Sequence, residues 1–124
     1  MNEWYILDEN NNVIRTNDIE VWSNFFKSKR RFLFYNKNDK YEVSTVFLGI
    51  NYAYDDELSP LVFESMVFEH NSRADLDLNR YSTYEEAKLG HIELCHKYGI
   101  YYLNPNNEKK IENINDIYNI NDEL

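Results

Sequence analysis

The segment 61–69 places apolar side chains on both faces of a predicted strand, and this pattern limits the fold more than any other feature of the sequence. Successive side chains of a strand point to opposite faces. One face carries Leu61, Phe63 and Val67, and the other carries Val62, Met66 and Phe68. A strand that is apolar on both sides lies inside a fold. Glu64 falls on the second face, which makes it the most interesting single carboxylate of the chain.

Further strands flank this segment. They are expected where β-branched and aromatic residues gather between polar turns. Residues 70–79 are polar and predict a loop. The other expected strands are 4–8, 13–15, 31–35, 41–50 and 100–103.

Two helices are predicted from their capping residues. Asn17 or Asp18 can cap a helix over 19–28. The run Ser82-Thr83-Tyr84-Glu85 has the form of a capping box with Ser82 as the cap, and it opens a helix over 83–98. Gly99 follows where a C-terminal glycine belongs. Gly90, inside this helix, predicts the close approach of another element.

These elements predict an α+β fold, with a small, mainly antiparallel sheet of about four to five strands and one or two packed helices. The apolar share of 43% is enough for a core. Residues 1–104 are interpreted as one domain. Residues 105–124 are rich in Asn and Ile, and they predict either a helix that docks on the domain or a disordered tail.

Charge is distributed unevenly along the chain. The net charge of -9 falls entirely in residues 51–124, because the first 50 residues hold as many bases as acids. An acidic protein is repelled by nucleic acid at long range, so direct nucleic-acid binding is not expected. A local basic cluster, read as the end of a helix and the rim of a hairpin, comprises Lys27, Lys29, Arg30, Arg31, Lys37 and Lys40.

Several classes of protein are disfavoured by composition. The single cysteine, Cys95, cannot form an internal disulfide and is read as a small apolar helix residue. Three glycines do not allow a phosphate-binding loop, and the acidic loops lack the calcium-loop pattern. No membrane helix and no signal peptide are apparent, so a cytoplasmic protein without cofactor or metal is expected.

Three blocks of the sequence resemble a widespread family of short phage and prophage proteins. They are Val43–Ile50 (VSTVFLGI), Pro60–Phe68 (PLVFESMVF) and Arg80–Ala87 (RYSTYEEA) followed by Gly90-His91. The corresponding family blocks read VSTVFLG, FETMVF and RYSTWEEA, with a later GH. The resemblance covers about half the chain. It departs from the family at Asn51-Tyr52, where relatives often have Asp-His, and any role of that pair is not carried over.

The resemblance implies a phage-encoded accessory protein in the host cytoplasm. With no catalytic set in the sequence, we expect it to act by binding a host or phage protein and not as an enzyme. One such role is inhibition of a host defence system, as anti-CRISPR proteins do. The alternative is a structural or assembly role in the phage life cycle, with a homodimer as one form.

Glu64 and His91 are the weak candidates for chemistry. Both lie on apolar faces of their predicted elements. If the helix packs on the sheet face that bears Glu64, the two side chains can meet. Glu64 could then act as a general base together with His91 in a small hydrolase, the two could be metal ligands, or they could form a purely structural polar pair. The structural interpretation is favoured, because no nucleophile or third ligand accompanies them.

Partner binding is expected at tyrosine-rich and acidic loops. Exposed tyrosines are common at protein interfaces. Acidic side chains of the second half can occupy a basic site on a partner. The candidate contact residues are Tyr52, Tyr54, Asp55, Asp56, Glu57, Asp75 and Asp77.

Overall fold

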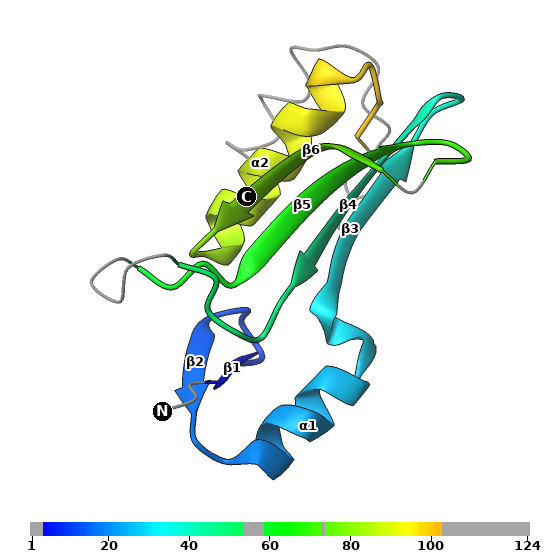
Figure 1. Ribbon diagram of the computed structural model, residues 1–124. Coiled ribbons are helices and arrows are strands. Elements are labelled where there is room, and N and C mark those ends of the chain that lie inside the picture. Colours follow the sequence, from blue (N-terminus) through cyan, green and yellow to red (C-terminus); the bar gives the residue numbers. More distant parts are fainter. Residues whose placement is uncertain (1–3, 54–58, 73, 103–124) are drawn as a thin grey trace.

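The computed structural model describes residues 4–53, 59–72 and 74–102, which form an α+β fold with two antiparallel sheets (Figure 1). The small sheet pairs β1 (Trp4–Leu7) with β2 (Val13–Thr16). The large sheet has the order β3 (Phe32–Lys37), β4 (Tyr41–Phe47), β5 (Phe63–Glu69) and β6 (Asp75–Tyr81). The helices are α1 (Ile19–Lys27), the 3₁₀ turn η1 (Lys29–Arg31) and α2 (Tyr84–Lys97). The predicted fold class is confirmed.

Residues 103–124 lie outside the described residues. The predicted tail or docking helix over 105–124 therefore stays a prediction, as does the division of the chain at residue 104. Leu103, the last residue of a predicted strand, falls in the same segment.

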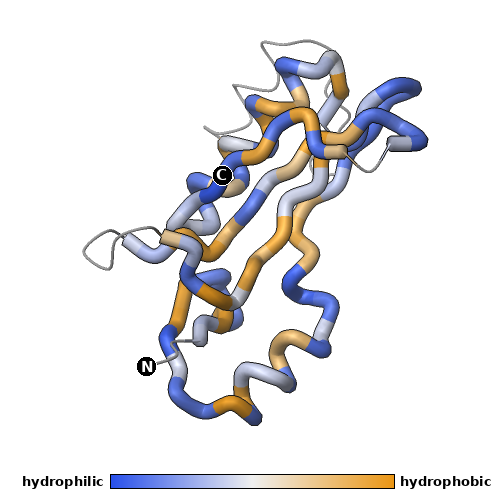
Figure 2. Tube along the Cα trace, in the orientation of Figure 1, coloured by the Kyte–Doolittle hydropathy of each residue, from blue (hydrophilic) through white to orange (hydrophobic). Residues whose placement is uncertain are grey.

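Each strand of the large sheet pairs with its neighbour in the chain, so the sheet is a meander. β5 is paired on both sides, with β4 along seven residues and with β6 along most of its length. This interior place matches the prediction from its apolar residues. Figure 2 shows hydrophobic residues recurring along these strands and hydrophilic ones at the turns between β3 and β4 and between β5 and β6.

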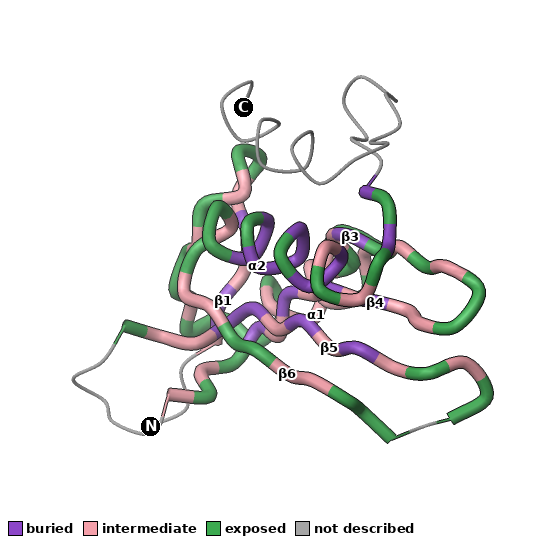
Figure 3. Tube along the Cα trace, turned by 90° about the horizontal axis from the view of Figure 1, so that it is seen from above, coloured by how far each residue is buried: buried purple, intermediate pink, exposed green. Residues whose placement is uncertain are grey.

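Helix α2 covers one face of the large sheet (Figure 3). Its buried residues include Ala87, His91 and Cys95, which recur at a spacing of four and so share one face of the helix. Under the helix lie the strand residues whose side chains point to this face, among them Val43 and Val67. The buried side chains of this layer form most of the core.

Both ends of α2 are capped by local hydrogen bonds. The N-cap is Thr83, whose hydroxyl accepts from the Glu86 N–H at 3.1 Å. The expectation of Ser82 as the cap is therefore wrong by one residue, because Thr83 is the residue with extended backbone just before the first helical turn. At the other end Gly99 has φ +70°, as predicted for a C-terminal glycine.

The β1–β2 hairpin and α1 close one end of the large sheet. Asp18 caps α1 by accepting from the backbone N–H groups of Glu20 and Val21. The Trp22 indole of α1 donates to the Gly49 carbonyl at 3.1 Å. Phe25 meets Phe47 edge to face, with ring centroids 5.7 Å apart. These contacts extend the core beyond the end of α2.

Two strand predictions are wrong. The predicted loop over 70–79 contains most of β6. The polar residues Asp75, Asp77 and Asn79 led to the loop prediction, because an edge strand needs fewer apolar side chains than an interior one. Residues 100–102 are not a strand, although Ile100 and Tyr102 are buried. The turn after α2 instead directs this segment back against the helix, and the Asn38 side chain donates to the carbonyls of residues 98 and 99.

Candidate functional site

The face of the large sheet opposite α2 is the most distinctive surface among the described residues, and we call it the open face. Strand residues that point away from α2 form it. The register arranges them in rows that cross the sheet, since paired residues share a face. The rows are Phe32, Val46, Glu64 and Arg80; Tyr35, Ser44, Met66 and Leu78; and Lys37, Glu42, Phe68 and Asp75.

The open face is apolar and aromatic at its centre and along β3. Phe32 is 57% exposed and Tyr35 is 55% exposed. Val46, Met66 and Leu78 are half-buried among their neighbours. A β-bulge between Phe32 and Phe34 interrupts the pairing of β3 with β4. A hollow of about 280 Å³ lies at this bulge, lined by Phe32, Leu33, Phe34, Tyr35, Ser44 and Thr45.

Glu64 lies on the open face in an ion pair. Its Oε2 accepts from Arg80 Nε at 2.9 Å, and the Glu64 side chain is only 12% exposed. The Arg80 guanidinium also lies over the Tyr52 ring, 4.6 Å from its centroid. Glu64 is therefore satisfied by a cation from the neighbouring strand, which accounts for a carboxylate among apolar residues.

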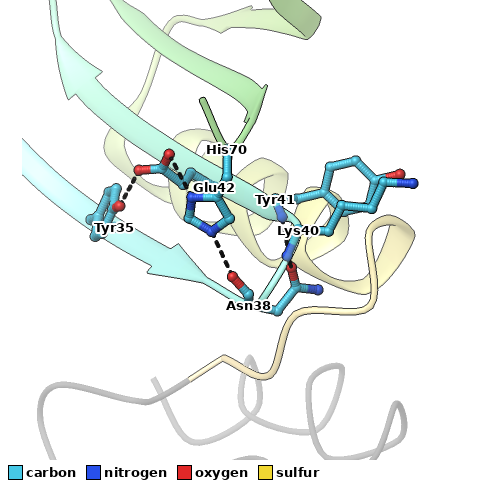
Figure 4. Close-up of polar contacts among 6 residues, drawn as sticks. All are labelled: Tyr35, Asn38, Lys40, Tyr41, Glu42 and His70. Carbon is cyan, nitrogen blue, oxygen red and sulfur yellow. Dashed lines mark hydrogen bonds and ion pairs between the residues drawn. The ribbon is translucent and has the colours of Figure 1, made fainter. Parts of the chain in front are cut away.

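Tyr35, Glu42 and His70 form a connected polar group at the other end of the open face (Figure 4). The Tyr35 hydroxyl donates to Glu42 Oε1, and this bond raises the pKa of Tyr35 to about 12. The second oxygen of Glu42 lies 3.2 Å from His70 Nδ1. His70 Nε2 lies 2.7 Å from the Asn38 carbonyl. The group ties the β3–β4 turn to the end of β5.

His91 lies in a buried polar chain on the covered face. Its Nδ1 is 2.7 Å from Thr45 Oγ1, which is 2.5 Å from Ser65 Oγ. Its Nε2 is 2.7 Å from Asn36 Oδ1. Because an amide oxygen only accepts, Nε2 carries the proton, and Nδ1 accepts from the Thr45 hydroxyl. Burial lowers the pKa of His91 to about 3, so the ring is neutral.

Glu64 and His91 therefore lie on opposite faces of the sheet, and the expectation that they can meet is wrong. The condition for that pairing was that α2 packs on the face of Glu64. The helix packs on the face of Ser65, the next residue along β5. A shift of one residue along a strand changes the face, so the sequence pattern of β5 left this choice open.

The residues that the sequence reasoning missed are Asn36, Thr45 and Ser65. A signal for two of them was present. Thr45 is in phase with Val43 and Phe47, and Ser65 is in phase with Phe63 and Val67. A small hydroxyl residue at an apolar position of two adjacent strands indicates a buried polar partner from another element. Asn36 lies outside the pattern, on a strand whose register depends on the bulge.

The expected partner-binding residues are dispersed. Tyr52 lies against Arg80 at the edge of the open face. Asp77 points to the covered side, where its Oδ2 accepts from Lys97 at 2.7 Å and from the Tyr98 hydroxyl at 3.1 Å. Asp75, the first residue of β6, is exposed and is paired with Phe68 of the open face. Tyr54, Asp55, Asp56 and Glu57 lie outside the described residues.

Within the residues that the structure describes, no group of three or more acidic, His or Cys side chains is placed to hold a metal ion. Cys95 is buried, and burial raises the pKa of its thiol to about 12, so its reactivity as a thiolate is suppressed. None of the described helices has the length and apolar character needed to cross a membrane.

Comparisons with known proteins give no family. No protein-family model matches the sequence, and no curated protein and no solved structure shows significant similarity to it. The resemblance to short phage proteins therefore stays a prediction, and the residues themselves are the basis for any function.

Proposed function

We propose that this chain is a phage-encoded accessory protein that acts by binding another protein, with the open face as its binding surface. The observation that supports this proposal most is the row Tyr35, Ser44, Met66 and Leu78, which carries no formal charge and crosses the whole sheet. Apolar and aromatic residues ringed by polar ones are the usual composition of an interface core.

The polar groups support binding over catalysis. Thr45 and His91 are the described hydroxyl and base that lie closest to a catalytic arrangement, yet neither has any exposed surface. A substrate cannot reach them without opening the contact between α2 and the sheet. The exposed group of Tyr35, Glu42 and His70 holds a base but no hydroxyl or thiol activated by it, because the phenol of Tyr35 is made less acidic by Glu42.

The resemblance to phage proteins supports a partner in the host cytoplasm. In its narrow form, the proposal is that the partner belongs to a host defence system and that binding blocks it, as an anti-CRISPR protein does. The net charge of -9 suits a partner with a basic surface, such as a nuclease. Electrostatic attraction to such a surface raises the association rate even when the contact itself is apolar.

A capture experiment with matched variants tests the proposal. The full chain, its Met66→Lys variant and its Leu89→Lys variant serve as baits for host lysate. Leu89 lies on the outer side of α2 and is 41% exposed, so the two variants gain the same charge on opposite sides of the molecule. We expect wild type and Leu89→Lys to hold the same partner and Met66→Lys to lose it.

The outcome against the proposal is equally specific. Capture of the same protein by all three baits would show that the open face is not the binding surface. Capture of nothing, together with no effect of the expressed chain on host defence or phage growth, would count against protein binding as the function. Circular dichroism and thermal melting of each bait show that it is folded before the result is interpreted.

A further inference from the structure

β3 forms one edge of the large sheet, and part of its backbone faces outward (Figure 1). In an antiparallel pair, residues whose N–H and C=O groups face the neighbouring strand alternate with residues whose groups face away from it. The Asn38 N–H donates to the Tyr41 carbonyl at 3.0 Å, so the backbone groups of Asn36 face β4 as well. Those of Tyr35 and Lys37 therefore point away from β4. Among the described strands, none pairs with this outer edge.

The two edge strands of the large sheet differ in their charges. Proteins usually protect an edge strand against further pairing by placing charged side chains along it. β6 is protected in this way by Asp75, Asp77 and Arg80. β3 begins instead with the uncharged run Phe32–Tyr35, whose first and last side chains are more than half exposed. The edge of β3 is thus the one suited to receive another strand.

The β-bulge of β3 adds a place for a side chain. The bulge lies at the start of the strand and leaves the pairing of residues 34–37 with β4 regular. The hollow of about 280 Å³ beside it has the same four residues, Phe32–Tyr35, in its wall. An apolar side chain of an added strand fits there while its backbone pairs with Tyr35 and Lys37. In strand addition, backbone hydrogen bonds supply affinity and such a hollow supplies specificity.

Both ends of β3 are basic, although the chain as a whole is acidic. Residues 27–42 hold six cations and two carboxylates, whereas the net charge of the chain is -9. The turn η1 places Lys29, Arg30 and Arg31 directly before β3, and Lys37 and Lys40 follow at its other end. At physiological ionic strength, charges more than about 8 Å away are largely screened, so these cations dominate beside β3.

Most of these cations keep their charge available. No carboxylate of the described residues forms an ion pair with Lys29, Arg31, Lys37 or Lys40. The Arg31 guanidinium lies between the rings of Phe26 and Phe32, 4.6 Å and 4.3 Å from their centroids, which fixes its position without neutralising it.

The remaining charges near this edge have partners inside the chain. Arg30 is partly compensated, because Asp8 lies close enough for the charge of Arg30 to lower its pKa. The two Glu42 oxygens are taken by Tyr35 and His70. Asp39 is then the one carboxylate of residues 27–42 without such a partner among the described side chains. The edge of β3 therefore attracts a negatively charged segment at both of its ends.

We propose that the outer edge of β3 binds an extended acidic segment of another protein as an added strand of the large sheet. The segment has apolar side chains in its middle and carboxylates toward its two ends, where η1 and the β3–β4 turn supply cations. The inference goes beyond the proposed function. An added strand lies in the plane of the sheet, so the open face stays available to the partner proposed for it.

Two matched peptides test the charge of the segment. Each has about ten residues, the length of a long strand, with valine and threonine alternating in the middle. One peptide carries glutamates at both ends and the other carries lysines. By isothermal titration calorimetry, we expect the full chain to bind the glutamate peptide in the micromolar range and the lysine peptide at least about tenfold more weakly. Equal affinities, or no binding of the glutamate peptide at near-millimolar concentration, would overturn the inference.

Methylation of the peptide backbone tests strand addition itself. Two versions of the glutamate peptide carry N-methyl groups on alternate residues, one on the odd positions and one on the even positions. Successive N–H groups of a strand point to opposite edges, so only one version loses the hydrogen bonds to β3. We expect that version to bind at least about tenfold more weakly and the other to keep its affinity. Equal effects of the two methylation patterns would contradict binding as a strand.

Amide hydrogen exchange shows where the peptide binds. In the free chain, the amides of Tyr35 and Lys37 should exchange quickly and that of Asn36 slowly. The glutamate peptide should slow the exchange of Tyr35 and Lys37 and leave the amides of β6 unchanged. Slow exchange of Tyr35 and Lys37 before any peptide is added would mean that residues 103–124 or a second copy already occupy the edge, and it would overturn an external partner.

Variants of the protein separate the edge of β3 from the open face. Exchange of both Lys37 and Lys40 for glutamate should weaken binding of the glutamate peptide at least about tenfold. Met66→Lys, at the centre of the open face, should leave the affinity within about twofold, and Leu78→Lys replaces it should that variant fail to fold. Loss of the peptide in Met66→Lys together with unchanged binding in the double variant would place the peptide on the open face and overturn the inference.

Discussion

The ring of Tyr81, on β6, lies against the backbone of Gly90 in α2. A β carbon on residue 90 would be 2.1 Å from the Tyr81 hydroxyl oxygen and 2.3 Å from two ring carbons, which is closer than side-chain atoms come in proteins. Tyr81 is paired with Phe63, the first residue of the interior strand β5. The tyrosine therefore occupies the space that any other residue at position 90 would need, and it sets how closely α2 approaches the edge strand.

Substitution of Gly90 by alanine should destabilise the protein. Alanine gains about 1 kcal/mol of helix propensity, but the forced movement of a packed ring costs more. We expect a net loss of roughly 1–3 kcal/mol in the free energy of unfolding, measured by urea denaturation. Leu89→Ala, one residue away and exposed, is the control and should change little.

A double variant shows whether the Tyr81 ring is the cause. Tyr81→Ala removes the obstacle, so Gly90→Ala should cost less in the Tyr81→Ala background than in the wild type. Equal costs in the two backgrounds would mean that the helix backbone tolerates a β carbon and that the glycine is required for another reason.

The sequence predicted this contact only in part. Gly90 inside a helix indicated that another element comes close, and the structure confirms it. The element itself, β6, was predicted as a loop, because Asp75, Asp77 and Asn79 give an edge strand a polar pattern. Where the signal was periodic and apolar, as in β5 and α2, the elements were predicted within two residues of their observed ends.

The candidate site was harder to predict, because it depends on which face of the sheet the helix covers. β5 offers apolar side chains on both faces, so the pattern alone does not assign Glu64 to the open face or Ser65 to the covered one. Which face each residue occupies is set by partners that are distant in the sequence. His91 reaches Thr45 and Asn36 on the covered face, and Arg80 reaches Glu64 on the open face.

Thr45 is expected to be the critical member of the buried polar chain. Thr45→Val keeps the shape of the side chain but removes the hydroxyl between His91 Nδ1 and Ser65 Oγ. Each buried polar group left without a partner costs about 1–3 kcal/mol, and chemical denaturation should show a loss in that range. Ser44→Ala, the neighbouring residue on the open face, should stay within about 0.5 kcal/mol of wild type.

The coupling of the two hydroxyls gives a second measurement. Ser65→Ala in the Thr45→Val background removes a group that has already lost its partner, so the double variant should lose less stability than the two single variants together. Additive losses would indicate that Thr45 and Ser65 contribute independently and would contradict a connected chain.

Stability should decrease as the pH falls through the mildly acidic range, because His91 cannot accept a proton while it is buried. The unfolded chain takes up this proton near the ordinary pKa of 6.5, whereas the folded chain does so only at about 3. Between these values the unfolded state binds more protons. Lowering the pH then costs up to about 1.4 kcal/mol per pH unit, and the loss begins as the pH falls below 6.5.

Residue-resolved NMR separates the effect of His91 on the pH dependence of stability from the effect of the carboxylates. The pKa values of Asp8 and Asp77 are lowered from 3.8 by their hydrogen bonds, so their contribution is lost only at more acidic pH. The His91 ring signals should keep their neutral-form shifts while the unfolding free energy already falls. A His91 signal that titrates near pH 6.5 in the folded protein would contradict burial of a neutral ring.

The pKa of Tyr35 reports directly on the polar group at the end of the open face. The Glu42 carboxylate accepts the phenol proton in a hydrogen bond and opposes the phenolate charge, and together with partial desolvation this raises the pKa of Tyr35 to about 12. Glu42→Gln removes the negative charge and should bring the pKa back toward 10. NMR of ring-labelled tyrosine resolves this residue from the other ten. Glu64→Gln lies on the same face beside Arg80 and should leave Tyr35 unchanged. A wild-type Tyr35 that titrates near 10 would show that the phenol and the Glu42 carboxylate are not in contact.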